Sequence, residues 1–472
     1  MFGNLKKKFI GDKAFYKSVL ALVIPLIIQQ GITSFVSLLD NIMVGALGTA
    51  SISAVAIVNQ LLMVFNLTIF GAISGVAIFG AQFFGKGDLE NFRFTFRFKM
   101  ILSVAASAIG ILVFLFFGGN LINMFLHESE GTAEEIKATY DFAMNYMYIM
   151  LIGLIPFAVV QAYGSTLRET GETVAPMVAS VIAILTNLVL NYLFMFGIFH
   201  WGVIGAALAT VISRYIEMIY VVLHAHRHKY KYGFIVGAYK SLYVPMQLIK
   251  KITITGFPLL LNETLWSMGI TAINQSYSLR GLEAVAAVNM NATAWQIFCI
   301  IMMAMGSAVA IIVGQHLGAG EIEKAKDVDN KLIFLTVVLH IGIGIIFMAA
   351  SPFIPLLYNV EPAVRSLATN LMIINGASLP IHAFVHVVYF TIRSGGKTMI
   401  TFFFDCVYTW CVPVVLASVL CNFTTLSLPY VYFAVQFIDI VKTVIGAFML
   451  KSGFWAKNII DEENKNEVKT NG

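Results

Sequence analysis

Asp40, Glu263 and Asp405 are acidic residues that lie within long apolar stretches of the sequence, where a charged group needs a partner or a function. Asp40 follows an uncharged run from Val19 to Leu39. A carboxylate inside a membrane costs about 3 kcal/mol or more and by default marks an ion or substrate pathway. Burial favours its protonated form and a bound cation its ionised form, so proton, cation and substrate can compete for Asp40. The alternative for Asp40 is an interfacial residue that reaches the water.

Two pairs of polar side chains also lie within apolar stretches, each pair spaced four residues apart. Asn187 pairs with Asn191 and His382 with His386, and residues four apart share one helix face. Amide oxygens and a hydroxyl such as that of Thr210 suit a hard cation such as sodium, although asparagines in spans also join helices. The histidines are either a neutral, hydrogen-bonded pair in a polar cavity or a protonation-linked gate.

The elements that must position these residues are membrane spans. The chain has 472 residues, of which 59% are hydrophobic and 12% charged, with a mean hydropathy of +0.84. Soluble domains carry about a quarter of their residues as charges. Twelve runs are long enough to cross a bilayer as helices: 16–39, 53–79, 98–118, 138–163, 174–196, 201–223, 252–275, 287–313, 331–353, 367–391, 399–420 and 429–450. The sequence therefore predicts an all-α integral membrane protein with twelve transmembrane helices.

Lysine and arginine residues predict the orientation of these helices. With a cytoplasmic N-terminus, only Lys137, Arg280 and Arg365 fall outside, and Arg214 and Lys442 fall within spans. The remaining 25 of the 30 basic residues then lie inside. This positive-inside bias predicts that both termini are cytoplasmic.

Two charge pairs spaced three residues apart lie within predicted spans. Arg214 precedes Glu217, and Asp439 precedes Lys442. Neighbours at this spacing on a helix can form ion pairs. We expect both to be intrahelical pairs with a structural role.

The two halves of the chain repeat each other. At an offset of 233 residues, Gln82 matches Gln315, Gly85 matches Gly318, and Pro25 matches Pro258. Collinear matches of this kind indicate a duplication. Six spans per half is an even number, so the halves form a parallel repeat about an axis along the membrane normal. The sequence predicts two six-helix lobes, in which the paired glycine turns are structural.

The polar stretch 224–245 divides the spans six and six. We expect an N-lobe at 1–223, a linker at 224–245, a C-lobe at 246–455 and a polar tail at 456–472. The three histidines of the linker suit a metal site, but a solvated cytoplasmic loop is the favoured interpretation.

Three motifs resemble those of the multidrug and toxic compound extrusion (MATE) family, in its bacterial NorM/DinF-like branch. They are NYLFMFGIFHWGVIGAALATVISRYIEM at 191–218, LRETGET at 167–173 and LLDNIMVGALG at 38–48. The resemblance implies a two-lobe antiporter of the bacterial plasma membrane. Such a protein exports organic, often cationic and amphiphilic compounds in exchange for Na⁺ or H⁺ by alternating access.

The resemblance also implies site residues. It places Asp40, Asn187, Asn191 and Thr210 together as a cation site of the N-lobe, with possible Na⁺ at Asp40. Some relatives carry a second carboxylate at the position of Asn191, so the amide here lowers the charge of the site. The coupling ion is therefore left open between Na⁺ and H⁺.

In the C-lobe, Glu263 resembles the span-7 glutamate of NorM-like and eukaryotic members. NorM-like relatives have an aspartate in span 10, where this chain has His382. That departure argues against a NorM-type sodium site in this lobe. His386 and Asp405 complete the expected C-lobe residues for substrate or ion, with no motif support for Asp405.

Two other functions compete with antiport. A flippase for lipid-linked saccharides shares the two-lobe plan, but a strongly basic cavity is expected there and only Arg214 and Lys442 lie within spans. An enzyme is disfavoured because no HExxH, GxSxG, Walker or haem-attachment pattern is present. We expect no cofactor beyond the coupling ion, small organic compounds and lipid as partners, no nucleic acid, and a monomer.

Overall fold

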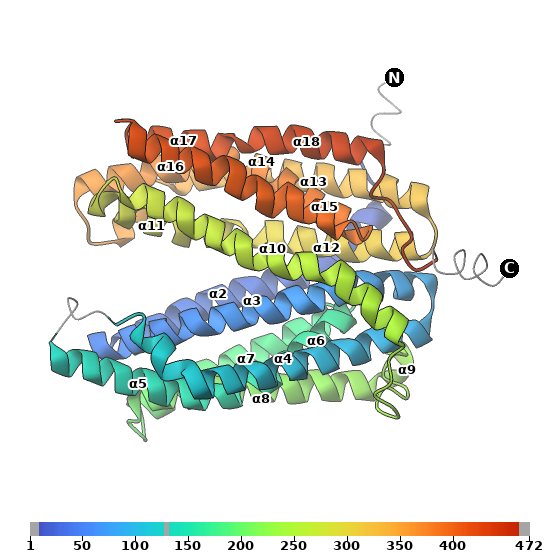
Figure 1. Ribbon diagram of the computed structural model, residues 1–472, viewed down its shortest axis with the longest axis horizontal. Coiled ribbons are helices and arrows are strands. Elements are labelled where there is room, and N and C mark those ends of the chain that lie inside the picture. Colours follow the sequence, from blue (N-terminus) through green and yellow to red (C-terminus); the bar gives the residue numbers. More distant parts are fainter. Residues whose placement is uncertain (1–8, 127–131, 462–472) are drawn as a thin grey trace. The chain divides into compact units, whose positions relative to one another are not determined.

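The structure is a computed structural model that describes residues 9–126 and 132–461, and within these ranges the chain contains helices and no strand (Figure 1). The basic residues Lys6, Lys7 and Lys8 and the tail from 462 onward lie outside the described residues.

Long α-helices alternate with short loops and a few π- and 3₁₀-helical turns. The first half contains α2 (Lys13–Gly45), α3 (Thr49–Lys86), α4 (Leu89–Asn123), α5 (Ala133–Ile152), α6 (Leu154–Glu169), α7 (Val174–Asn191), η2 (Tyr192–Phe196), α8 (Gly202–Arg227) and α9 (Lys229–Tyr232). The second half contains α10 (Met246–Ser278), α11 (Leu282–Phe298), α12 (Ile300–Gly318), α13 (Ile322–Ala350), η3 (Ile354–Leu357), α14 (Pro362–Ser394), α15 (Thr398–Phe402), η4 (Phe403–Val407), η5 (Trp410–Val414), α16 (Val415–Phe423), α17 (Leu428–Phe437) and α18 (Asp439–Ser452).

Eleven of the twelve predicted spans overlap a segment that is long and apolar enough to cross a membrane, although the predicted span 287–313 does so only through α12, its first part lying in α11. Among the described residues, ten helices meet this condition, and α5 with α6, bent by 45° at their break, make the eleventh. The remaining predicted span, 252–275, lies in α10, which has 33 residues. Asn262 and Glu263 lie in the middle of α10 and lower its hydropathy, and both belong to the polar network described below.

The helices form two compact units. The N unit comprises Ile28–Gly80 and Leu89–Ile252, and the C unit comprises Met1–Ile27, Ala81–Asp88 and Thr253–Gly472. These units are defined by packing, whereas the lobes expected from the sequence are defined by the repeat. The lobe borders at 223 and 246 therefore stay a prediction.

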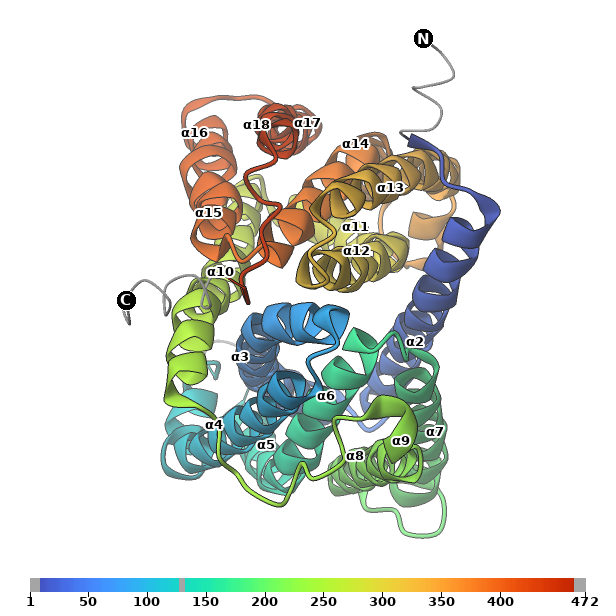
Figure 2. The same ribbon diagram turned by 90° about the vertical axis from the view of Figure 1, so that its right-hand side faces the viewer.

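The N unit is a bundle in which α8 packs against α5, α6 and α7, and α4 packs against α5 and α6. Figure 2 shows these five helices end-on. Its core contains buried apolar side chains such as Val58, Met147 and Ala207. Large apolar side chains also point outward, and Phe116 is 76% exposed. An apolar outer surface of this kind is typical of a lipid-facing bundle.

The C unit is organised around α14, which packs against α11, α12, α13, α17 and α18. Buried apolar side chains such as Ala308, Leu371 and Val388 form its core. Because α14 is surrounded by these helices, polar residues on it must find partners within the unit. This helix carries His382 and His386.

Two glycines of the sequence repeat allow a close helix crossing within the C unit. A Cβ on Gly85 would lie 2.0 Å from the Gln315 carbonyl oxygen, and one on Gly318 would lie 1.9 Å from that of Gln82. The two contacts are reciprocal, as a pseudo-two-fold relation between repeated segments requires. The structural role expected for these glycines is confirmed, although close approach rather than tight turning is their function.

Replacing Gly85 with alanine is expected to destabilise the folded protein by about 1–3 kcal/mol or more, because the added methyl group overlaps backbone that cannot rotate away. The thermal unfolding midpoint in detergent micelles checks this. The matched control is Gly342→Ala in α13, where an added Cβ meets nothing within 4 Å. A G85A protein as stable as G342A would contradict the crossing.

The linker is more ordered than the solvated loop that the sequence predicts. Tyr232 and Phe234 are buried. Arg97 on α4 donates to the carbonyl oxygens of Gly237 at 2.8 Å and Ala238 at 2.7 Å. These side chains and backbone groups attach the linker to the N unit.

An ion pair outside the spans joins the linker to the loop between α6 and α7. Glu172 accepts hydrogen bonds from Lys231 Nζ at 2.6 Å, Tyr232 Oη at 3.2 Å and the Ala175 N–H at 3.2 Å. Burial raises the pKa of Glu172, but these hydrogen bonds outweigh burial and bring the pKa below its usual 4.5. A lowered pKa means that the stabilisation is present above 4.5 and is lost as the pH falls through the folded-state value.

We therefore expect Glu172→Gln to raise hydrogen exchange in the 229–240 segment at pH 7, and we expect this effect to decrease as the pH is lowered towards about 3. The effect at pH 7 is expected to be about 0.2–1 kcal/mol, since the Lys231 side chain is 62% exposed. Hydrogen exchange of wild type and E172Q, compared at each pH, measures it. A difference that persists unchanged at pH 3 would contradict this assignment.

Candidate functional site

The four residues expected for the N-lobe cation site lie together in the N unit. Asn191 Nδ2 donates to Asp40 Oδ1 at 2.7 Å and to Asn187 Oδ1 at 3.2 Å. Asn187 Nδ2 lies 3.2 Å from Thr210 Oγ1. Turning the Asn187 amide places its nitrogen 3.1 Å from Asp40 Oδ2 and its oxygen 3.2 Å from Thr210 Oγ1, which satisfies both groups. Both orientations keep the four side chains in one cluster.

Local helix geometry positions these side chains. Asn187 and Asn191 lie one turn apart on α7, and α7 packs against α8, which carries Thr210. Directly after Asn191 the helix widens into the π-helical η2. Gly205 of α8 allows the two elements to approach, because a Cβ there would lie 2.8 Å from the backbone of Phe194. Such π-turns are frequent at functional sites.

The cluster combines an unpaired carboxylate with an unused acceptor. Asp40 forms no ion pair with any residue that the structure describes. Asn191 Oδ1 is buried and accepts no hydrogen bond from the described chain. Carboxylate, amide and hydroxyl oxygens are the ligands that a hard cation prefers. The arrangement can bind either a proton at Asp40 or a small cation shared among these oxygens.

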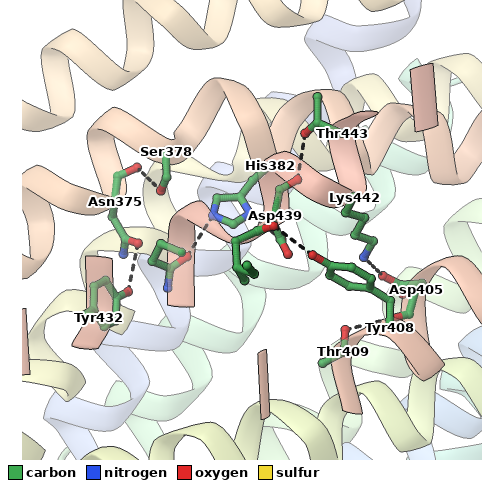
Figure 3. Close-up of polar contacts among 12 residues, drawn as sticks. Asn375, Ser378, His382, Asp405, Tyr408, Thr409, Tyr432, Asp439, Lys442 and Thr443 are labelled. Carbon is green, nitrogen blue, oxygen red and sulfur yellow. Dashed lines mark hydrogen bonds and ion pairs between the residues drawn. The ribbon is translucent and has the colours of Figure 1, made fainter. Parts of the chain in front are cut away.

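The C unit brings two of its expected residues, Glu263 and Asp405, into one polar network. Tyr389 Oη donates to Glu263 Oε1 at 3.0 Å. Asn262 Nδ2 donates to Asp405 Oδ2 at 3.0 Å and lies 3.4 Å from Tyr389 Oη. Lys442 Nζ forms an ion pair with Asp405 Oδ1 at 2.7 Å (Figure 3). Unlike Asp40, the carboxylate of Asp405 is therefore neutralised by a basic partner.

The two expected intrahelical charge pairs are absent from the described residues. Lys442 binds Asp405 on η4, and Asp439 lies 3.4 Å from His382. In the N unit, Arg214 donates to the Gly153 carbonyl at 3.3 Å. Cross-helix partners bury these charges more effectively than a neighbour on the same helix, which is why the spacing rule fails here.

The two histidines of α14 have different surroundings. His382 Nε2 lies 2.9 Å from Gln436 Oε1, and its Nδ1 lies 3.4 Å from Asp439 Oδ2 (Figure 3). His386 packs against the ring of Phe390, and its Nε2 has no hydrogen-bond partner among the described residues. The expected hydrogen bonding is found at His382 alone, because the shared helix face meets Gln436 and Asp439 there, whereas His386 lies one turn further along against Phe390. The alternative of a protonation-linked gate stays a prediction.

Three residues that contact the acids of the candidate C-unit site are not among the site residues expected from the sequence. Asn262, Tyr389 and Lys442 all contact the C-unit acids. Only Lys442 carried a usable signal, since a buried lysine and a buried aspartate in one lobe are expected to pair. Asn262 and Tyr389 are ordinary residue types for membrane helices.

A known protein family matches this chain twice, once in each half of the sequence repeat. Residues 25–193 and 258–419 match the family described as MatE. The two matches begin 233 residues apart (258 − 25 = 233), the offset found in the sequence. The internal duplication is thereby confirmed.

Relatives and solved structures cover nearly the whole chain. The "Probable multidrug resistance protein NorM" of Thermotoga maritima is 22% identical over 459 residues, which is 94% of each chain. The "Probable multidrug resistance protein YoeA" of Bacillus subtilis is 24% identical over 88% of each chain. A mutant of the MATE transporter VcmN from Vibrio cholerae has a TM-score of 0.85 at 16% identity, covering 94% of this chain and 98% of that one. An outward-facing multidrug resistance MATE transporter has a TM-score of 0.81 at 18% identity, covering 94% and 97%. These structures share the two-lobe helical fold.

Proposed function

Because the chain belongs to the MatE family and is a multi-pass membrane protein, we propose that it is a secondary antiporter that exports organic compounds in exchange for Na⁺ or H⁺. Its relatives are named multidrug resistance proteins, which supports organic and often cationic, amphiphilic substrates. The single observation that carries the mechanism is Asp40, which has no basic partner among the described residues and lies beside the unused acceptor Asn191 Oδ1.

In this proposal Asp40 is the coupling residue. A proton or a sodium ion neutralises its charge, and Asn187, Asn191 and Thr210 supply neutral oxygens around it. The site then alternates between an ion-bound and an ion-free state, and the change of charge biases alternating access. The ion is cargo, not a resident cofactor.

The C-unit network is assigned to substrate rather than to the coupling ion. Asp405 is already neutralised by Lys442, so a cation gains little from it. Glu263 accepts a hydrogen bond from Tyr389 but forms no ion pair in the described chain. Of these two acids, Glu263 is therefore the one open to a cationic substrate, and it lies in the electrostatic field of Arg393. Arg393, His382 and His386 all lie on α14.

Flipping of lipid-linked saccharides is the second candidate, since the wider superfamily shares the fold. The names of the relatives favour drug efflux. A flipping assay on a fluorescent lipid-linked saccharide discriminates the two. We further propose a monomer in the bacterial plasma membrane with cytoplasmic termini.

Counterflow in proteoliposomes tests the proposal and identifies the ion. Liposomes preloaded with a cationic dye receive a sodium gradient or a proton gradient separately. Dye movement against its own gradient is expected with one of them and not with a potassium gradient of equal size. Absence of movement with both gradients, with the protein correctly inserted, would overturn antiport.

A further inference from the structure

The N unit contains a polar cavity at a different level from the Asp40 cluster. It has a volume of about 280 Å³ and is lined by α2, α6, α7 and α8. Its polar lining residues are Gln29, Gln30, Gln161, Arg168, Ser180 and Glu217. Ser180 and Glu217 each lie seven residues from a cation-cluster residue, Asn187 and Thr210 respectively. Seven residues are two helical turns, about 10 Å, so the two sites are separate layers on the same helices.

Arg168 supplies an available positive charge in this cavity. The guanidinium lies beside Gly164, which is one turn earlier on α6. A Cβ added to Gly164 would lie 3.5 Å from Arg168 Nη1. No residue that the structure describes accepts a hydrogen bond from Arg168 or forms an ion pair with it. A guanidinium offers a planar fork of donors that fits carboxylates and other oxyanions.

Glu217 supplies a negative charge that is only partly used. Ser180 Oγ donates to Glu217 Oε1 at 2.6 Å, and Gln29 Nε2 donates to Ser180 Oγ at 2.7 Å. This chain of hydrogen bonds fixes the carboxylate. Arg214, three residues earlier on α8, does not neutralise it by contact, because its guanidinium bonds the Gly153 carbonyl.

Arg168 and Glu217 line the same cavity without touching. Arg168 lies in the electrostatic field of Glu169 and, less strongly, of Glu217, and Glu217 lies in that of Arg214 and, less strongly, of Arg168. No ion pair joins Arg168 to Glu217 within the described residues. Buried opposite charges normally close into a pair, because separation leaves each desolvated without a contacting partner. Here the cavity keeps them apart, so a ligand with one group of each sign can compensate both.

We propose that this cavity is a substrate subsite for small amphoteric compounds, with an oxyanion group bound by Arg168 and a cationic group bound by Glu217. Its volume of about 280 Å³ lies just below the roughly 300–1,000 Å³ of ligand pockets, which suits a small molecule or one end of a larger one. The proposal deepens the export function and rests on it for its physiological meaning. The Asp40 cluster has no comparable cation, so it does not distinguish amphoteric from purely cationic compounds.

A matched pair of dyes tests the subsite by binding alone. Rhodamine 110 carries a free carboxylate and a cationic ring system, and rhodamine 123 is its methyl ester. Fluorescence polarisation with the full-length protein in non-ionic detergent, corrected for empty micelles, gives both dissociation constants. We expect wild type to bind rhodamine 110 at least about tenfold more tightly than the ester, since losing one partner of a desolvated charge pair weakens binding by this much or more.

Two variants separate the charges. Arg168→Gln is expected to bring the ratio of the two constants to about one, and Arg168→Lys to an intermediate value because a lysine lacks the fork. Glu217→Gln is expected to weaken both dyes and to keep the ratio. A misfolded variant would lose binding of both dyes, so it would not give a changed ratio in one variant and an unchanged ratio in the other. The control is Arg227→Gln, an exposed charge at the end of α8 outside the cavity, which should leave both constants unchanged.

A wild-type ratio near one, or a tenfold ratio that survives in R168Q, would overturn the subsite. If the ratio behaves as expected but proteoliposomes show no export, the antiport proposal fails and the subsite stands. If export proceeds and the ratio is one, the subsite fails and antiport stands.

Discussion

Replacing Asp40 with asparagine is expected to reduce ion-driven export by at least about 30-fold, to the level of empty liposomes. The amide keeps the size of the side chain and its contact with Asn191, but it can neither release a proton nor offer a negative charge to a cation. Loss of one partner of a desolvated charge contact costs about 2–5 kcal/mol, which corresponds to a factor of 30 or more. The measurement is initial dye efflux per reconstituted protein under the coupling gradient.

The control for this variant is Asp141→Asn on α5, an exposed aspartate of the same unit. D141N should transport like wild type, which shows that loss of one acid from the N unit is tolerated. The thermal unfolding midpoint of D40N shows that it is folded, and flotation with the liposomes shows that it is inserted. Full export by a well-inserted D40N protein would remove Asp40 from the coupling mechanism.

The sequence predicts the scaffold well because apolar run length and repeat offsets are direct physical signals. A run of twenty apolar residues has few alternatives to a membrane helix. The turn glycines Gly87 and Gly320, with φ of +78° and +77°, also repeat at the 233 offset. Positive φ favours glycine strongly, so such residues survive duplication and mark it.

The N-unit cluster is predictable for a similar reason. Asp40 is the acid of its span, and Asn187 and Asn191 share a helix face. Spacing alone shows that the two asparagines share a helix face, but it does not show which helices meet. The resemblance to the family is what groups them with Asp40 and Thr210 in one cluster. The hydrogen bonds of Asn191 then agree with that grouping.

Partners of buried charges could not be predicted from spacing. The positive-inside pattern places Lys99 among the cytoplasmic basic residues, yet its side chain is fully buried. The spacing pairs Lys442 with Asp439 three residues away, but Lys442 binds Asp405, 37 residues away. These partners depend on how helices pack, which depends on the whole set of side chains at each crossing.

Replacing Lys99 with methionine is expected to destabilise the protein by about 3–5 kcal/mol, because it leaves a buried carboxylate without its cation. Lys99 Nζ forms an ion pair with Glu169 and donates to Thr166 Oγ1 at 3.2 Å, and Ser165 Oγ donates to Glu169 Oε1 at 2.9 Å. The pair joins α4 to α6. The thermal unfolding midpoint measures the change.

Two further variants determine whether charge or packing is responsible. Lys326→Met breaks an exposed pair with Glu323, whose side chain is 86% exposed, and should change stability by less than about 1 kcal/mol. The double variant Lys99→Met with Glu169→Gln removes both charges, and it should recover most of the loss, since replacing a whole buried pair is often neutral. If the double variant is as unstable as K99M, the effect comes from packing around Lys99. If K99M is as stable as K326M, the buried pair does not hold α4 against α6, and the Glu169 carboxylate does not need its lysine.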